Sequence, residues 1–198
     1  MDNAKLLADL RLEMVTVCQK IFNRGLTSAT SGNLSARLPG RPEQVLIKRT
    51  GKSFGDVHPE DFLLVDLEGN VLEGEGKPSK ELFFHLAIYR RRPEVNAVLH
   101  GHSPYTTAYV LAKGELPLVT VAAELSLVKV PVVGYAPPGS QELAGMVGTA
   151  FEEPGVKAAV LLRHGYITVG QDCHGAFYLA DVLEDNAKTA FLLAQLSR

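Results

Sequence analysis

The chain has 198 residues, 46% of them apolar, and a formal net charge of −2 with both signs scattered along it. It can bury one sizeable core, so we expect one domain over residues 1–198, and it lacks the basic stripe that a nucleic-acid partner requires. No apolar run has the length of a secretory signal or a membrane span, and Cys18 and Cys173 form no Cys-x-x-Cys pair. We therefore expect a cytoplasmic protein with no membrane contact and no disulfide framework.

The predicted elements begin with an amphipathic helix. Its apolar residues recur at three- and four-residue spacing, and Gly25 is placed to cap its C-terminal end. The short apolar runs that follow are separated by turn residues, including 39–42, which is typical of antiparallel hairpins. The helix covers 6–21, and the hairpin strands cover 34–38, 45–49, 61–66 and 71–72.

Two loops of small polar residues interrupt these elements. The run Thr27–Asn33 is either an ordinary turn or a cradle in which backbone N–H groups, an amide and hydroxyls hold an anion. A second such loop, Thr50–Ser53, follows the strand over 45–49. The residues alone leave both interpretations open.

Glu81 lies where a flexible segment is predicted to become a helix. Gly74–Pro78 precedes it, and Ser79 is a suitable N-cap for a helix over 80–91. A carboxylate in the first turn of a helix is favoured by the helix dipole. Glu81 by itself therefore needs no functional explanation.

The second half of the chain alternates helices with strands and ends in a long helix. Ser103 with Pro104, and later Ser140, are typical helix starts. The predicted helices cover 105–112, 140–151 and 175–196, and the predicted strands cover 118–121, 128–133, 158–162 and 166–169. The long helix should bury Ala176, Leu179, Ala180, Leu183, Ala187, Ala190 and Phe191. Together the elements predict an α/β sandwich of mostly antiparallel strands with helices on both sides.

His100 and His102 lie two residues apart on an apolar run. On an extended strand they share a face with Val98, so the two imidazoles can converge on one cation at about 2.0–2.1 Å per Zn–N bond. The alternative is a pair of ordinary, partly buried histidines. The His-x-His pattern alone does not decide between these possibilities.

Glu81 and His164 favour the metal site. With His100 and His102 they supply three imidazoles and one carboxylate, which is typical of a catalytic metal with an open position. Such a metal acts as a Lewis acid on a substrate oxygen. Glu81 can cap the resting metal and then move off as a base.

Five short motifs stand in a fixed order along the chain. They are Ser31-Gly32-Asn33-Leu34-Ser35, Thr50-Gly51, Lys77-Pro78-Ser79-x-Glu81, His100-x-His102 and His164-Gly165. Together they resemble the class II aldolase/adducin-head family over essentially the whole chain, and most closely its aldolases for L-fuculose 1-phosphate. The resemblance implies a three-layer α/β/α sandwich around a mostly antiparallel sheet. It also implies a homotetramer with active sites at subunit interfaces.

The resemblance further implies an activity and the residues that perform it. The activity is a zinc-dependent cleavage of a ketose 1-phosphate, similar to L-fuculose 1-phosphate, into dihydroxyacetone phosphate and an aldehyde through a metal-stabilised enediolate. One Zn²⁺ per subunit is implied, with Glu81, His100, His102 and His164 as ligands and Glu81 also as general base. The implied phosphate-binding positions are Gly32, Asn33, Thr50, Gly51 and Ser79, with Lys80 beside them.

Two departures from the family pattern bear on these roles. Lys80 stands where the aldolases commonly have a second serine, so its cation either strengthens phosphate binding or reaches another anionic group. The tyrosine that the fuculose enzymes bring from a neighbouring subunit as proton donor falls near Val121. Glu124, Tyr135 and Tyr166 remain as candidate acids, each with a structural explanation as well.

Two alternatives stay open. The same zinc and phosphate groups suit a 3-oxo-tetronate 4-phosphate decarboxylase, a pentulose-phosphate 4-epimerase or a methylthioribulose-1-phosphate dehydratase. Pro-Ser-Lys-Glu at 78–81 is similar to the decarboxylase branch, whereas an epimerase usually has Asp at the position of Glu81. The other alternative, a non-catalytic adducin-like interaction module, lacks the metal-binding residues that this chain retains.

Overall fold

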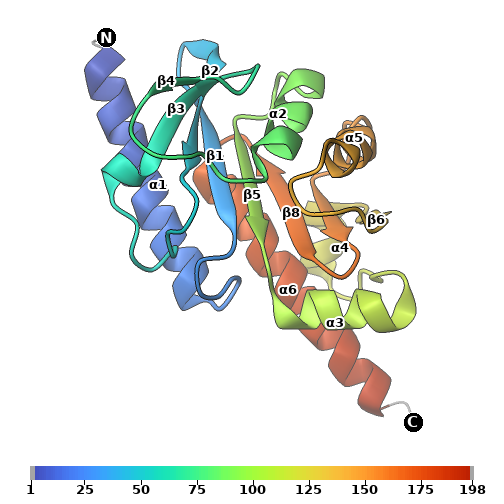
Figure 1. Ribbon diagram of the computed structural model, residues 1–198. Helices are drawn as coiled ribbons and strands as arrows, with labels where there is room; N and C mark the ends of the chain where they lie inside the picture. Colours follow the sequence, from blue (N-terminus) through green and yellow to red (C-terminus); the bar gives the residue numbers. More distant parts are fainter. Residues whose placement is uncertain (1–2, 197–198) are drawn as a thin grey trace.

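The computed structural model describes residues 3–196, in which eight strands join into one sheet (Figure 1). The strand order is β4-β3-β2-β1-β5-β8-β7-β6, and every neighbouring pair is antiparallel except β6 with β7. The strands are β1 Asn33–Leu38, β2 Arg41–Lys48, β3 Phe62–Asp66, β4 Val71–Glu73, β5 Ala97–Gly101, β6 Val132–Val133, β7 Ala158–Leu161 and β8 Gly165–Gly170. The mostly antiparallel sheet is confirmed.

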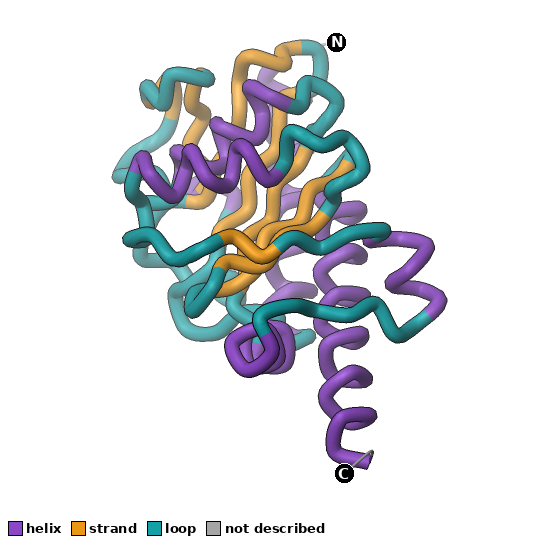
Figure 2. The backbone as a smooth tube through the Cα atoms, turned by 90° about the vertical axis from the view of Figure 1, so that its right-hand side faces the viewer, coloured by secondary structure: helices purple, strands orange, loops and turns teal. Residues whose placement is uncertain are grey.

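Helices cover both faces of this sheet, as Figures 1 and 2 show. They are α1 Asn3–Asn23, α2 Leu82–Arg91, α3 Pro104–Lys113, α4 Val121–Leu127, α5 Gln141–Ala150 and α6 Cys173–Leu196, with a short 3-10 helix η1 Pro59–Asp61. One core, which includes Met14, Val110 and Ala180, lies between the sheet and α1, α3, α4 and α6. The other includes Leu86 and Val147 and lies between the sheet and α2 and α5. The three-layer α/β/α sandwich is therefore confirmed, and the single domain stays a prediction.

The central pair of strands brings two distant segments into register. β1 pairs with β5 so that Asn33 lies opposite His100 and Ser35 lies opposite Val98. Directly opposed residues on antiparallel strands point to the same face of a sheet. Because Val98 belongs to the core under α2 and α5, Asn33 and His100 face that side as well.

The start of α2 differs from the prediction. The helix begins at Leu82 with Glu81 at its N-cap, so Ser79 is not the capping residue. The reason is that Pro78 still forms a bridge with Arg49, which keeps the chain extended up to this point. Ser79 instead stabilises the turn, because its hydroxyl accepts the backbone N–H of Glu81 at 3.3 Å.

The predicted strand over 118–121 is wrong, and the one over 128–133 shrinks to β6. Side-chain caps supply a helix start here, because Asn186 Oδ1 accepts the backbone N–H of Val119 at 2.9 Å and Thr120 Oγ1 accepts that of Ala123 at 3.2 Å. These bonds outweigh the strand preference of the β-branched residues and begin α4. Val128, at φ 58°, ends the helix, and only Val132–Val133 pair with β7.

The last turns of α6 depart from the expected buried stripe at one position. The alanines of the stripe and Leu183 are buried and Leu179 is partly buried, but Phe191 is 39% exposed. Figure 1 shows the C-terminal end of α6 running past the edge of the sheet, and the Phe191 ring packs edge-on against Tyr105 of α3, with 5.7 Å between the ring centres. Within residues 3–196, no helix has both the length and the apolar character needed to cross a lipid bilayer.

β5 ends at Gly101, where three segments approach closely. A methyl group there would lie 2.3 Å from the Tyr166 hydroxyl and 2.7 Å from the carbonyl oxygen of Leu26. Tyr166 is buried, and its hydroxyl donates to that same carbonyl at 3.2 Å, so neither group has room to move. Gly101 thus lets the chain continue from His100 to His102 through a crowded site.

Gly101→Ala is expected to lower the free energy of unfolding by about 1–3 kcal/mol, because the added methyl overpacks a rigid site. Gly145→Ala is the matched control. Gly145 lies inside α5 with nothing within 4 Å of an added methyl, and alanine there should raise stability by about 0.5–1 kcal/mol. Denaturant unfolding measures both, and a Gly101→Ala variant as stable as the parent would contradict the close approach.

Candidate active site

Four side chains from three segments meet at the end of β5. Glu81 comes from the turn before α2, His100 and His102 from the end of β5, and His164 from the turn between β7 and β8. The Nε2 atoms of His100 and His102 are 2.8 Å apart. Glu81 Oε2 lies 3.2 Å from His100 Nε2, and Glu81 Oε1 lies 3.0 Å from His164 Nε2. The structure thus brings together the four residues that the sequence analysis proposed as metal ligands.

The hydrogen bonding of His100 fixes which ring nitrogen faces the site. Its Nδ1–H donates to the carbonyl oxygen of Tyr166 at 2.7 Å. Burial lowers the pKa of His100 to about 3, so the ring is neutral near pH 7 and its Nε2 carries a lone pair. That lone pair faces Glu81 Oε2, and two acceptors at 3.2 Å repel each other unless a cation or a proton lies between them.

The charge and spacing of the four groups fit a divalent metal. Burial raises the pKa of Glu81, but His100, His164 and the Asn33 amide outweigh it and hold that pKa well below its usual value. Burial, helped by His164, also lowers the pKa of His102, so His100 and His102 offer uncharged imidazoles beside a carboxylate. Ligands at about 2.0–2.1 Å from a tetrahedral zinc lie about 3.3 Å apart, close to the 2.8–3.2 Å separations here.

Within the described part of the chain, the three histidines form the only cluster of three or more His, Cys, Asp or Glu residues that could hold a metal ion. Their ligand atoms all lie within 4.8 Å of one another. This cluster is therefore the candidate metal centre, and the identity of its ion belongs to the proposal below.

A cavity of about 350 Å³ opens beside the metal ligands. Its lining includes Glu81, His102 and His164 together with all six residues that the sequence analysis proposed for phosphate binding. Those six are Gly32, Asn33, Thr50, Gly51, Ser79 and Lys80. The structure brings them to one cavity, and their binding role stays a prediction.

Two glycines of this lining adopt backbone conformations that other residues rarely adopt. Gly32 has φ 77° and Gly51 has φ 80°. A methyl group on Gly32 would lie 2.9 Å from Thr27 Oγ1 and 3.0 Å from the carbonyl oxygen of His100. The loop before β1 therefore packs directly against the strand that carries the metal ligands.

The polar side chains of the lining differ in their contacts. Asn33 Nδ2 donates to Glu81 Oε2 at 2.8 Å, so the Asn33 amide is hydrogen-bonded to the Glu81 carboxylate. Lys80 is exposed, which suits contact with an incoming anion. Asn33, in contrast, is buried, with only 3% of its surface exposed.

The sequence analysis missed Lys48, which also lines the cavity. Lys48 ends β2, is only 2% exposed, and burial lowers its pKa to about 8. Its ammonium group donates to the carbonyl oxygen of Lys52 and lies 5.5 Å from the ring centre of Phe54. A lysine directly after the apolar run Val45–Ile47 was the available signal for a buried cation.

His85 was missed as well. It is fully buried and forms hydrogen bonds with Asn33 and Ser35. Burial lowers the pKa of His85 to about 3, so this ring is also neutral near pH 7. Its position four residues after Glu81, one helical turn along, was the signal in the sequence.

None of the three candidate acids lines the cavity. Tyr166 is buried, and its hydroxyl is committed to the carbonyl oxygen of Leu26. Tyr135 is 58% exposed, and its ring centre lies 5.6 Å from the guanidinium carbon of Arg163. Glu124 is exposed on α4. These contacts favour the structural explanation for the two tyrosines.

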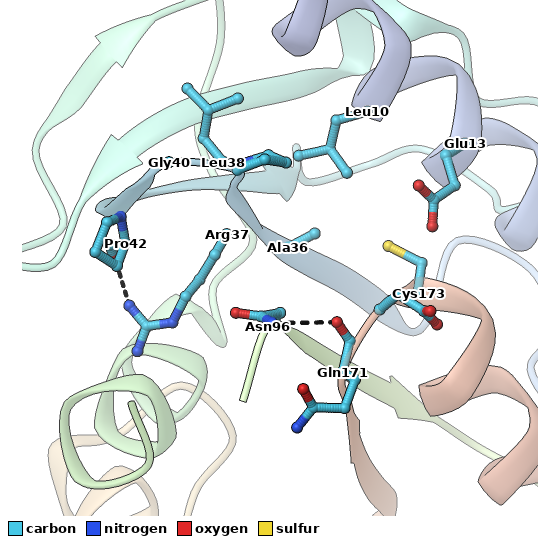
Figure 3. A pocket seen from close by; sticks show the side chains of 12 residues that line it. Leu10, Glu13, Ala36, Arg37, Leu38, Gly40, Pro42, Asn96, Gln171 and Cys173 are labelled. Carbon is cyan, nitrogen blue, oxygen red and sulfur yellow. Dashed lines mark hydrogen bonds between the residues drawn. The ribbon is translucent and has the colours of Figure 1, made fainter. Parts of the chain in front are cut away.

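A second cavity, of about 280 Å³, lies at the other end of β1 (Figure 3). Arg37 is the cationic residue of its lining, and Figure 3 shows its side chain directed at Pro42. The guanidinium donates to the carbonyl oxygens of Pro42, Val95 and Tyr89. Arg37 therefore spends its guanidinium on backbone carbonyls and is not free to bind an anion in this cavity.

The chain is similar to known proteins along most of its length. The family model for the class II aldolase and adducin N-terminal domain matches residues 12–191. An L-fuculose phosphate aldolase from Methanococcus maripaludis is 35% identical over 184 residues, which cover 93% of this chain and 97% of that protein. A 3-oxo-tetronate 4-phosphate decarboxylase from Escherichia coli O6:H1 is 33% identical over 197 residues, which cover 97% of this chain and 91% of that protein. A solved structure of L-fuculose 1-phosphate aldolase has a TM-score of 0.89 at 29% identity and covers 96% of this chain and 89% of its own.

The buried, neutral His85 predicts that stability falls in mild acid. Its pKa is about 3 in the folded protein against the ordinary 6.5, so between these values only the unfolded chain binds the proton. Stability should therefore decrease as the pH drops below about 6.5, by about 1 kcal/mol at about pH 5.5 from this residue. Denaturant unfolding of the metal-free protein measures the loss. His85→Gln is the control because glutamine has no proton to gain, and an equal loss in both proteins would exclude His85 as its source.

Proposed function

The chain belongs to the class II aldolase and adducin N-terminal domain family, and from this premise we propose that it is a zinc-dependent lyase acting on a ketose 1-phosphate. The products are dihydroxyacetone phosphate and an aldehyde. L-fuculose 1-phosphate or a similar sugar is the proposed substrate. The relative from Methanococcus maripaludis, at 35% identity, supports this choice because its name specifies L-fuculose phosphate.

One observation carries the proposal: the neutral His100 presents its Nε2 lone pair to a carboxylate oxygen of Glu81 at 3.2 Å. We propose that one Zn²⁺ per chain is held there by these two residues with His102 and His164. When bound, the metal supplies Lewis-acid polarisation of a substrate carbonyl, which makes the adjacent C–H acidic. The four residues provide the negative charge and the lone pairs that such an ion requires.

Glu81 is the proposed general base. Its carboxylate reaches the cavity, and the segment Gly74–Pro78 just before it contains two glycines that give the turn freedom to move. In the synthetic direction Glu81 takes a proton from the hydroxymethyl carbon of dihydroxyacetone phosphate. In the cleavage direction the bond between C3 and C4 of the ketose breaks, the C4 hydroxyl loses its proton as the aldehyde forms, and Glu81 delivers one proton to C3, so the net change moves a proton from that oxygen to carbon.

The phosphate is proposed to bind against the loops before β1 and after β2. These loops offer backbone N–H groups, hydroxyls and an amide, which are the donors that an anion requires. The donors come from Gly32, Asn33, Thr50, Gly51 and Ser79. Lys48 and Lys80 add positive charge to the same lining, which favours a doubly charged phosphate over a neutral sugar end.

We also propose, from the family resemblance, a homotetramer with active sites at subunit interfaces. Support comes from apolar side chains that lie open on and beside α4. Val121, Leu125 and Val128 are 71%, 76% and 62% exposed. Apolar groups clustered in this way commonly mark a protein–protein contact.

A second candidate activity is the decarboxylation of 3-oxo-tetronate 4-phosphate. Lys80 favours it, because an exposed cation in the cavity lining suits a substrate carboxylate. The relative from Escherichia coli that is named for this reaction is 33% identical. Both proposed activities use the same metal-binding and phosphate-binding residues. They differ in the group that leaves the reacting carbon, which is an aldehyde in one and carbon dioxide in the other.

Glu81→Gln should keep most of the bound metal and lose nearly all turnover. Three histidines still hold the ion, whereas an amide cannot accept the proton, and loss of a positioned base lowers a rate by about 10²–10⁴-fold. Elemental analysis and steady-state kinetics measure the two effects. His100→Ala is the comparison variant and should lose metal as well as turnover. A Glu81→Gln variant within about tenfold of the parent rate would assign the base to another residue.

Lys80→Ser separates the two candidate activities. In an aldolase the change should leave ketose 1-phosphate cleavage largely intact, since serine is the residue that the family pattern has there. In a decarboxylase it should remove activity selectively, because the substrate carboxylate loses its partner. A panel of phosphorylated ketoses and sugar acids, with product identification, measures both. Carbon dioxide released from a 3-oxo sugar-acid phosphate, with no dihydroxyacetone phosphate from any ketose phosphate, would overturn the aldolase assignment.

A further inference from the structure

A series of buried hydrogen bonds runs from Glu81 into the core under α2. Asn33 Nδ2 lies 2.8 Å from Glu81 Oε2, and Asn33 Oδ1 bonds to His85 Nε2. On the other side of its ring, His85 Nδ1 lies 2.7 Å from Ser35 Oγ, which is 2.9 Å from the Tyr89 hydroxyl. The four residues beyond Glu81 are each at most 3% exposed, so water does not compete for these bonds.

The chemistry of each group sets the direction of every bond in this series. A carboxylate only accepts hydrogen bonds, so Asn33 must turn its NH₂ group to Glu81 and its carbonyl oxygen to His85. That oxygen also only accepts, so His85 must donate from Nε2. Burial keeps the ring neutral by lowering the pKa of His85 to about 3, and a neutral imidazole has one N–H, so Nδ1 must accept from Ser35.

The far end of the series is anchored in the sheet. Ser35 gives its proton to His85, so its oxygen accepts from the Tyr89 hydroxyl. Burial raises the pKa of Tyr89, which keeps the phenol protonated and able to donate. Ser35 itself lies in β1, opposite Val98 in the pairing of β1 with β5. Every donor therefore points toward Glu81, starting from the Tyr89 hydroxyl, and the sheet holds Ser35 in place between them.

We propose that His85 is a positioning residue that locks the Asn33 amide in the one orientation in which it donates to Glu81. His85 does not line the cavity, so it acts on the site through Asn33 alone. If the amide turned over, its oxygen would face the carboxylate and its NH₂ would face the His85 N–H, which breaks both bonds. The proposal rests on the proposed function in one respect, because it takes Glu81 as the base whose position matters.

The tautomer of His85 is the first test, and it needs neither substrate nor metal. Long-range ¹H–¹⁵N correlation spectra of the metal-free protein, labelled at histidine, should place the His85 proton on Nε2 and leave Nδ1 bare. The signals of His85 are identified as those that are present in the parent spectrum and absent from the His85→Gln spectrum. A proton on Nδ1 in the parent protein would overturn the proposal whatever reaction the protein catalyses.

A double-mutant cycle is the second test. His85→Leu should lower kcat by about tenfold or more with metal content unchanged, since residues that orient a metal ligand typically have effects of this size. His85→Gln should restore most of that loss, because its amide nitrogen can donate to Asn33 as Nε2 does. In the Asn33→Ala background, His85→Leu should have no further effect, because its route to Glu81 is already cut.

His174→Leu, on α6, which packs against the sheet face opposite α2, is the matched control and should keep the parental kcat. Equal losses from His85→Leu in the parent and in the Asn33→Ala background would show that His85 does not act through Asn33 and would overturn the proposal. Failure of His85→Gln to restore activity would do the same. If the parent protein turns over no ketose phosphate or sugar-acid phosphate, the proposed function fails while the tautomer still decides the role of His85.

Discussion

The register between β1 and β5 is the constraint on which the rest of the structure depends. It sets Asn33 beside His100 and points both to the face that α2 covers, where Glu81 arrives from a turn. A slip of one residue would send His100 into the opposite core and replace it with Leu99. Gly101 is also required at the end of β5. Because it has no side chain, the backbone can pass close to Tyr166 and place His102 beside His100. Strand pairing thus places His100 and His102 among the proposed metal ligands, whereas Glu81 and His164 reach the same point from turns.

This constraint explains what the sequence could and could not predict. The period-two spacing of His100 and His102 predicts convergence because a strand repeats every two residues, and the structure confirms it at 2.8 Å. The cavity lining was predicted mainly through the family motifs, since no local pattern links residue 32 with residue 80. Lys48 and His85 were missed because their importance depends on burial, which arises only when β2 and α2 pack. The strand predicted over 118–121 failed for a similar reason, since a side chain of α6 caps the helix that forms there.

The buried groups of the site are stable only as a set. A carboxylate and several imidazoles removed from water carry a large desolvation cost unless each finds a partner. Glu81 has Asn33 on one side and histidines on the other, and His100 spends its N–H on a backbone carbonyl. The Nε2 lone pair of His100 then faces the Glu81 carboxylate, and a cation between the two acceptors offsets their repulsion. The protein therefore folds into a site whose carboxylate and lone pairs suit a divalent cation.

The division between buried and exposed groups separates the side chains of this site that packing constrains from those that it leaves free. Glu81, His100 and Asn33 are held by strand register and buried hydrogen bonds, so changing any of them disturbs the packing around it. Lys80 is exposed in the lining of the same cavity and makes no such contribution to the core. A scaffold of this kind can keep proton transfer and metal binding constant while its exposed lining adapts to a different group on the substrate. Such a division is compatible with the names of two relatives of similar identity to this chain, one of which specifies an aldolase and the other a decarboxylase.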